Sequence, residues 1–480
     1  MAPPPRSVHP VVGLTAACAL VAVILLVVQV AADSIGSSAP IPVEVRAQPE
    51  VPSGGSTPVI SLRRGGAELV SRQGFGQLDV ALNNFATQID SRSCVRVAVG
   101  DVVSDAGRDA VAIPASSLKV LTAAAAVDVL GEDYRFTTTV RGDTPVDGVV
   151  DGDVALVGGG DPLLSGDWYP VSALDRFAVL SPTSLDTLAR EVAAAGVRRI
   201  TGSVVGDASR WPEQRYLDSW ADGVAGIEAG PLSALVVNDS RVEGGQFRYD
   251  DPVEAAVIEF ERALSRAGVV VDNGSGSGVG DVVLAEIASA PMSDVIVEML
   301  QTSDNNTAEM LVREIGLVSA GIGTTEAGLE TMMGYLSSRG ADTSEFVLLD
   351  GSGLAPGNRI SCDALLRVLT SVPDSVLDAL AVAGVSGTLV DVYADTDWAG
   401  RLRAKTGTLG NPPYDADPPA VKALVGELIP GETDEPMRFA LVLNQYQIDD
   451  QSRYRPLWAD LLDILDAGPD GVSTADVGPR

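Results

Sequence analysis

The chain has 480 residues, of which 46% are apolar, and a formal net charge of −32 at neutral pH. This length predicts two or three domains, and the acidic balance argues against nucleic acid as a partner because phosphate binding needs clustered Lys and Arg. The single histidine is His9. The rest of the chain therefore has no histidine to serve as the base for a serine or cysteine nucleophile, and a histidine-ligated zinc site is excluded.

A long uncharged run lies close to the N-terminus. Residues 1–9 predict a short cytoplasmic tail, and residues 10–32 contain no charged side chain. Such a run is long enough to span a bilayer, so we expect an uncleaved membrane anchor. A cleaved signal peptide is the alternative, with the cleavage site in "VAAD" at residues 30–33. Both place the bulk of the protein in the cell envelope, outside the cytoplasm.

The elements that follow predict an α/β protein with an insertion. Residues 33–74 are rich in Ser, Pro and Gly and predict a flexible stalk. Residues 75–142 supply a helix, a strand and a second helix, and form the first part of one α/β unit. Short apolar runs between Gly and Asp turns predict β-rich inserted domains over residues 143–288. Residues 289–480, with helical periodicity, three strand-like runs and a last helix, form the second part.

Two cysteines lie in the region expected outside the cytoplasm. In an oxidising compartment Cys94 and Cys362 can form a disulfide. The alternative is two buried thiols, because the sequence gives no distance between them.

Lysine is scarce in this chain, and one lysine follows a serine by one helical turn. Of 33 basic residues only Lys119, Lys405 and Lys422 are lysines. Ser116 and Lys119 lie in "PASSLKVLTAAAA", which predicts a helix that starts at the serine and ends at Gly131. Residues three apart share a helix face, so the amine can reach the hydroxyl. Unlike Arg, a lysine with a lowered pKa can act as a base. The alternative role for Ser116 is a helix cap.

Two further motifs lie downstream. Ser303 and Asn305 belong to "TSDNN" between two helical stretches, where the serine can relay a proton and the amide can hold substrate. Lys405, Thr406, Gly407 and Thr408 end a strand-like run, where a cation and two hydroxyls suit a carboxylate and the glycine allows close approach of substrate. A cap or turn, and a lysine that protects a sheet edge, are the ordinary alternatives. The combined order S-x-x-K, S-D-N, K-T-G is typical of penicillin-binding proteins and β-lactamases.

The resemblance extends well beyond these motifs. Stretches such as "LVGGGDPLL", "VVGDASRW", "PLSALVVND", "LLDGSGLAPGNRIS" and "GRLRAKTGTL" resemble the D-alanyl-D-alanine carboxypeptidase/endopeptidase family, the class C low-molecular-mass penicillin-binding proteins. The family implies a catalytic domain of the penicillin-binding-protein and serine β-lactamase type. In that domain a five-stranded sheet has helices on both sides and is interrupted by a β-rich insert.

The resemblance also implies roles for individual residues. Ser116 is expected to be the acylated nucleophile and Lys119 its base, with Ser303, Asn305 and Lys405 as the other catalytic groups. Thr406, Gly407 and Thr408 would bind the substrate carboxylate. Asp207, in "GDASRW", would contact the diaminopimelate side chain of the stem peptide. The sequence departs from the family after "DGSGL", where relatives often have Ser-Arg and this chain has Ala355 and Pro356, although Arg359 lies nearby.

The function implied is a serine D-Ala-D-Ala carboxypeptidase that trims peptidoglycan stem peptides through an acyl-enzyme and is inhibited by β-lactams, without a metal or organic cofactor. An endopeptidase activity on cross-links is compatible with it. One alternative is a β-lactamase, in which deacylation is fast. The other is a non-catalytic cell-wall-binding scaffold with the same fold.

Overall fold

The computed structural model covers most of the chain after the predicted stalk. The described residues are 75–100, 102–174, 176–221, 223–275, 278–411, 417–430 and 436–468. The predicted tail, anchor and stalk lie outside them. Among the described residues, no helix combines the length and apolar character needed to cross a membrane.

An antiparallel sheet organises the first and last parts of the chain. Its described strands follow the order β14-β15-β16-β17-β1-β2. Their bounds are β1 Cys94–Val99, β2 Val102–Val103, β14 Ala381–Val382, β15 Leu402–Leu409, β16 Val421–Leu428 and β17 Met437–Asn444. Six strands of this sheet lie in the described residues, where the resemblance implied five. The two-residue strands β2 and β14 form its edges and are too short to give a pattern in the sequence.

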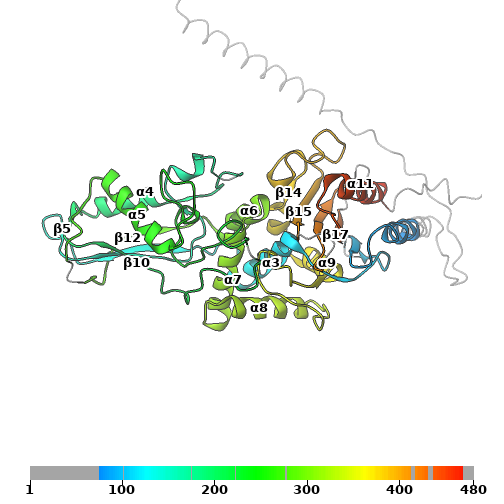
Figure 1. The fold of residues 1–480 in the computed structure, drawn as a ribbon, viewed down its shortest axis with the longest axis horizontal. Helices are drawn as coiled ribbons and strands as arrows, with labels where there is room; N and C mark the ends of the chain where they lie inside the picture. The colour runs from blue at the N-terminus through cyan, green and yellow to red at the C-terminus, as the bar shows by residue number, and fades with distance from the viewer. Residues whose placement is uncertain are drawn as a thin grey trace, which may run out of the picture. The chain divides into compact units, whose positions relative to one another are not determined.

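Side chains alternate between the two faces of this sheet, and helices cover both. Along β16, Val421, Ala423 and Val425 pack into one core, whereas Leu424 and Leu428 pack into the other. The first core contains α3, α6, α7, α8 and α9, and the second contains a helix over residues 75–86 and α11 (Figure 1). The bounds are α3 Lys119–Leu130, α6 Met292–Thr302, α7 Asn305–Ala320, α8 Thr325–Ser338, α9 Cys362–Ser371, α10 Asp374–Asp378 and α11 Gln451–Ala467.

The insertion has its own sheets and its own core. One sheet has the order β10-β6-β4-β12 and a smaller one has the order β11-β9-β5. Their bounds are β4 Thr137–Gly142, β5 Val149–Val150, β6 Val154–Val157, β9 Arg199–Ile200, β10 Val204–Asp207, β11 Val270–Val271 and β12 Val282–Ala288. Because β4 pairs with both β6 and β12, we propose that the insert begins near residue 137 rather than 143.

The insert is not purely β. Two helices, α4 Leu185–Ala194 and α5 Pro252–Arg266, pack on its sheets. In α4, Leu185, Leu188, Ala189 and Val192 are buried at the spacing of one helix face. The prediction of a β-rich insert overlooked this periodicity. Short strand pairs complete the described structure: β3 Val111–Ala112 with β13 Ile360–Ser361, and β7 Leu164–Ser165 with β8 Thr183–Ser184.

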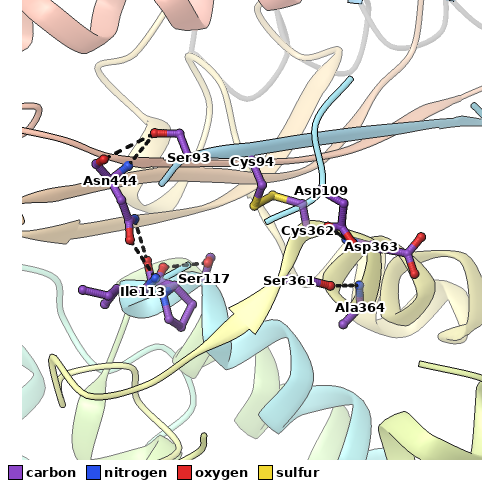
Figure 2. Close-up of a disulfide and its surroundings, with 11 residues drawn as sticks. Ser93, Cys94, Asp109, Ile113, Ser117, Ser361, Cys362, Asp363, Ala364 and Asn444 are labelled. Carbon is purple, nitrogen blue, oxygen red and sulfur yellow. Dashed lines mark hydrogen bonds between the residues drawn. A yellow bond between two sulfur atoms is a disulfide. The ribbon is translucent and has the colours of Figure 1, made fainter. Parts of the chain in front are cut away.

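A disulfide joins the sheet to a covering helix. Cys94, at the start of β1, is bonded to Cys362, at the start of α9, across 268 positions of sequence (Figure 2). Beside it, Ile113 N donates to Asn444 Oδ1 at 2.8 Å and Asn444 Nδ2 donates to Ile113 O at 3.0 Å. The end of β17 therefore holds the backbone three residues before Ser116.

Candidate active site

The serine turn has a constrained backbone. Ser116 lies in a short 3₁₀ helix, Ala115–Leu118, that leads directly into α3. Ala115 has a φ of 48°, a conformation that a non-glycine residue rarely adopts unless its surroundings impose it. Two glycines, Gly353 and Gly407, pack directly against this turn. A Cβ added to Gly353 would lie 1.9 Å from Ala115 O, and a Cβ added to Gly407 would lie 2.9 Å from Pro114 O. The half-buried Ser116 has no role as a side-chain cap.

Lys119 is enclosed beneath this serine. Its side chain is 0% exposed. Its Nζ lies 3.1 Å from Ser116 Oγ, 2.7 Å from Asn305 Oδ1 and 2.7 Å from Ser352 O. The amide and carbonyl oxygens can only accept hydrogen bonds, so in the neutral amine they take its two N–H hydrogens. The remaining lone pair then faces Ser116 Oγ, which can donate.

The second motif divides its tasks between neighbouring residues. Ser303 ends α6 with a φ of 65°, and its hydroxyl accepts a hydrogen bond from Lys405 Nζ at 2.8 Å. Asp304 caps α7 by accepting from Thr307 N at 2.5 Å. Asn305 turns its Oδ1 to Lys119 and donates from Nδ2 to Glu228 O at 2.9 Å. A helix cap, the alternative interpretation of this motif, is therefore present, but Asp304 forms it. Ser303 and Asn305 instead form hydrogen bonds with the two lysines.

The third motif lies on β15. Lys405 is 0% exposed and also donates to Thr406 O at 2.9 Å. Thr406 Oγ1 donates to Thr388 Oγ1 at 3.0 Å, and the exposed Thr408 accepts from Lys422 Nζ at 2.7 Å. The contacts of Gly407 give a reason for glycine that the sequence did not suggest, because this residue packs against the serine turn itself.

Burial weakens the basicity of both motif lysines. It lowers the pKa of Lys119 to about 8, against the opposing effect of Asp304, Asp350 and Glu309. The pKa of Lys405 is also lowered, first by burial and then by the ammonium groups of Lys119 and Lys422. Near neutral pH a usable fraction of Lys119 is therefore the free amine, which is the form that can accept a proton.

The insert reaches the second motif. Asn306 Oδ1 accepts from Gly230 N at 2.6 Å, and Asn306 Nδ2 donates to the half-buried Asp239. A cavity of about 280 Å³ opens at this place. Its lining includes Ser303 and Asn305 together with Arg176 from the insert. A polar hollow lined by two residues of the second motif is suited to hold part of a substrate.

Two residues singled out in the sequence, Asp207 and Arg359, form hydrogen bonds with residues close to them in the chain. Asp207, at the end of β10, accepts from Ser209 N at 2.9 Å, which forms an ordinary turn. Within the described part of the chain no hydrogen bond links Asp207 to the three motifs, and its role in diaminopimelate binding stays a prediction. Arg359 donates to Pro356 O and Asn358 O at 2.9 and 2.8 Å.

Sequence reasoning missed several groups that complete the site. Ser352 and Glu228 contribute backbone oxygens, which any residue type could supply, so no side-chain pattern reveals them. Asn306 carries a signal only as a second asparagine after the motif. Lys422 could have been noticed as the remaining lysine. Its closeness to Thr408, however, follows from the pairing of β15 with β16, which the sequence does not reveal.

Comparisons with known proteins show which family the sequence resembles. The model of the D-Ala-D-Ala carboxypeptidase 3 (S13) family matches residues 77–245 and 236–457. A D-alanyl-D-alanine carboxypeptidase of Actinomadura sp. (strain R39) is 31% identical over 421 residues, which cover 69% of this chain and 73% of the relative. A carboxypeptidase of Mycolicibacterium smegmatis is 30% identical over 353 residues, covering 69% and 71%.

The fold has a counterpart among solved structures. Penicillin-binding protein 4 of Haemophilus influenzae gives a TM-score of 0.63 at 19% identity, covering 80% of this chain and 99% of that one. A complex of the same protein with a β-lactam gives a TM-score of 0.57. At such identity the likeness concerns the fold, which is the predicted penicillin-binding-protein architecture. The family match covers most of the chain, and the chain belongs to the D-Ala-D-Ala carboxypeptidase 3 (S13) family.

Proposed function

We propose that this protein is a serine D-Ala-D-Ala carboxypeptidase that acts on the stem peptides of peptidoglycan and is acylated by β-lactams. The observation that carries the proposal is the buried Lys119 amine 3.1 Å from Ser116 Oγ, with its other two contacts made to oxygens that only accept. Membership of the family supports the substrate class.

The proposed reaction begins at Ser116. The Lys119 amine takes the Ser116 proton while Oγ attacks the carbonyl carbon between the two D-alanines. The C–N bond breaks, and the departing nitrogen takes a proton from Ser303 Oγ. Lys405 Nζ, which lies 2.8 Å from Ser303 Oγ, then gives a proton to this oxygen. D-alanine leaves, with Lys119 protonated and Lys405 neutral. Water then attacks the acyl carbon and passes one proton through Ser303 Oγ to Lys405, while Ser116 Oγ leaves the acyl carbon and takes back the proton from Lys119. Thr406 and Thr408 hold the terminal carboxylate in this scheme.

Location follows from the substrate. Peptidoglycan lies outside the cytoplasmic membrane, so the catalytic domain works there. We propose that residues 10–32 anchor it, because they contain no charge and are long enough to span a bilayer.

Intact-mass measurement tests the function. The soluble region, residues 75–480, is mixed with benzylpenicillin and followed over time beside Ser116→Ala. A persistent penicilloyl adduct that is absent from the variant is expected. A transient adduct with consumption of penicillin would instead indicate a β-lactamase, and no adduct would favour a non-catalytic scaffold.

The rate of acylation should depend on pH. Because the pKa of Lys119 is about 8, the free amine becomes about tenfold more abundant for each pH unit gained well below that value. The second-order rate constant for benzylpenicillin is therefore expected to rise roughly tenfold between pH 6 and pH 7. Intact-mass measurements on reactions quenched at set times, at constant ionic strength, give this profile, and circular dichroism recorded at each pH checks the fold. A flat profile with an unchanged fold would contradict the base role of Lys119.

A further inference from the structure

Lys422 is the one lysine that the proposed mechanism does not use. It lies on β16, directly opposite Thr408 of β15 in the antiparallel register. Its Nζ donates to Thr408 Oγ1 at 2.7 Å. Thr408 is exposed, so a ligand can reach its hydroxyl from solvent. The contact therefore connects a charged group on the neighbouring strand to the third motif.

The direction of this hydrogen bond determines what Thr408 can do. An ammonium group has donors and no acceptor, so the threonine oxygen must be the acceptor. The hydroxyl hydrogen is then left to donate to another group. With Lys422 charged, the hydroxyl is both oriented and polarised toward an anionic acceptor such as a carboxylate.

The local charge also favours an anion, although the whole chain is strongly acidic. Lys405 lies on the same strand as Thr408, and the charges of Arg176 and Arg455 act on Lys422 together with that of Asp449. Arg176 also lines the cavity beside the second motif. Lys422, Arg176 and Arg455 thus place three basic groups near the end of β15, against the one carboxylate of Asp449, in a protein with a net charge of −32.

We propose that Lys422 is a positioning residue for the terminal carboxylate of the substrate and acts through the Thr408 hydroxyl. The inference rests on the proposed function and deepens it, since it assigns a specificity-determining role to a residue outside the three motifs. It predicts a preference for ligands with a free carboxylate over the same ligands with that group blocked.

Lys422 also has contacts that suit a purely structural role. Its Nζ lies 4.3 Å from the ring centroid of Tyr454 and 5.3 Å from that of Trp458, both on α11. A role limited to fastening β16 to α11 would affect all ligands alike. Selectivity for the carboxylate therefore separates the two roles.

The experiment compares benzylpenicillin with its methyl ester, in which the carboxylate is blocked. Second-order acylation rates are measured by intact mass for the wild type, Lys422→Met, Lys422→Arg and the control Arg455→Met. Arg455 stacks on Tyr454 and Tyr393, so its replacement removes a nearby cation without touching Thr408. Lys422→Met should slow acylation by benzylpenicillin about 10- to 100-fold, the range for a hydrogen bond to a charged group. It should change acylation by the ester less than threefold. Lys422→Arg should retain most of the preference, and Arg455→Met all of it.

Equal losses for the two ligands, or no loss, would overturn the inference. If Lys422→Met does not fold, Thr408→Val removes the hydroxyl through which Lys422 acts and must show the same selective loss. A Thr408→Val variant without that selectivity would also overturn the inference. Absence of any adduct on the wild type would instead defeat the proposed function, and the inference with it.

Discussion

Replacement of Lys119 by arginine should lower the rate of acylation by benzylpenicillin about 10³-fold, within the range for loss of a general base. Arginine keeps a positive charge near Ser116 but cannot give up its proton at any working pH. Without a lone pair opposite Ser116 Oγ, the hydroxyl keeps its hydrogen and remains a weak nucleophile. The rate constant is measured by intact mass over a wide range of penicillin concentration.

Lys119→Met tests whether the loss of acylation comes from the missing base or from the larger size of arginine. Lys119 is 0% exposed, and the larger guanidinium must displace its neighbours. Lys119→Met has nearly the same volume and neither charge nor base. Both variants are expected to lose acylation, and the methionine variant should keep a near-native melting temperature. Acylation of Lys119→Met within tenfold of the wild type would rule out the proposed base.

The central contact of the site could be predicted because it is local. Ser116 and Lys119 are one turn apart, and any helical or 3₁₀ path over residues 115–119 brings them together. The second and third motifs could be placed only by resemblance, since 186 positions separate Lys119 from Asn305. The disulfide is similar: the sequence allowed Cys94 and Cys362 to pair, but its 268-residue separation leaves the distance undetermined.

The features of the site that the sequence does not reveal are mostly backbone carbonyl groups and backbone conformations. Ser352 O and Glu228 O bind the Lys119 amine and the Asn305 amide, and a carbonyl group has no signature in the residue type. The strain at Ala115 is equally invisible, because alanine gives no sign of a positive φ. Gly353 and Gly407 leave a trace as glycines, but the reason for them appears only where they meet the serine turn.

Two buried carboxylates, Glu309 and Asp350, accept hydrogen bonds from the loop that supplies Ser352 O. Asp350 is fully buried and accepts four hydrogen bonds. The donors are Gly353 N at 2.9 Å, Ala355 N at 2.6 Å, Asn358 Nδ2 at 2.7 Å and Trp220 Nε1 at 3.1 Å. Three of these donors lie within the loop, and the fourth comes from the insert. The carboxylate thus fixes the loop shape that presents one oxygen to Lys119 and a glycine to Ala115.

Asp350→Ala is therefore expected to lower the free energy of unfolding by about 3–5 kcal/mol, because it leaves four buried donors without an acceptor. Denaturant unfolding followed by circular dichroism measures this loss. Asp342→Ala is the matched control, since that exposed carboxylate lies in the same connection after α8 and accepts from Ser344, two residues further on. It should leave the unfolding midpoint nearly unchanged.

Acylation provides the second measurement on Asp350→Ala. Where the variant is still folded, the displaced Ser352 carbonyl no longer holds one N–H of Lys119, so the lone pair loses its fixed direction toward Ser116. The acylation rate should fall at least tenfold at temperatures well below unfolding. A variant as stable as Asp342→Ala, or one that acylates at the wild-type rate, would show that the loop keeps its shape without this carboxylate. Ser352 O would then still hold the Lys119 amine, with the loop fixed by the buried Glu309, whose Oε1 accepts from Gly351 N at 3.1 Å and from Ser352 N at 2.8 Å.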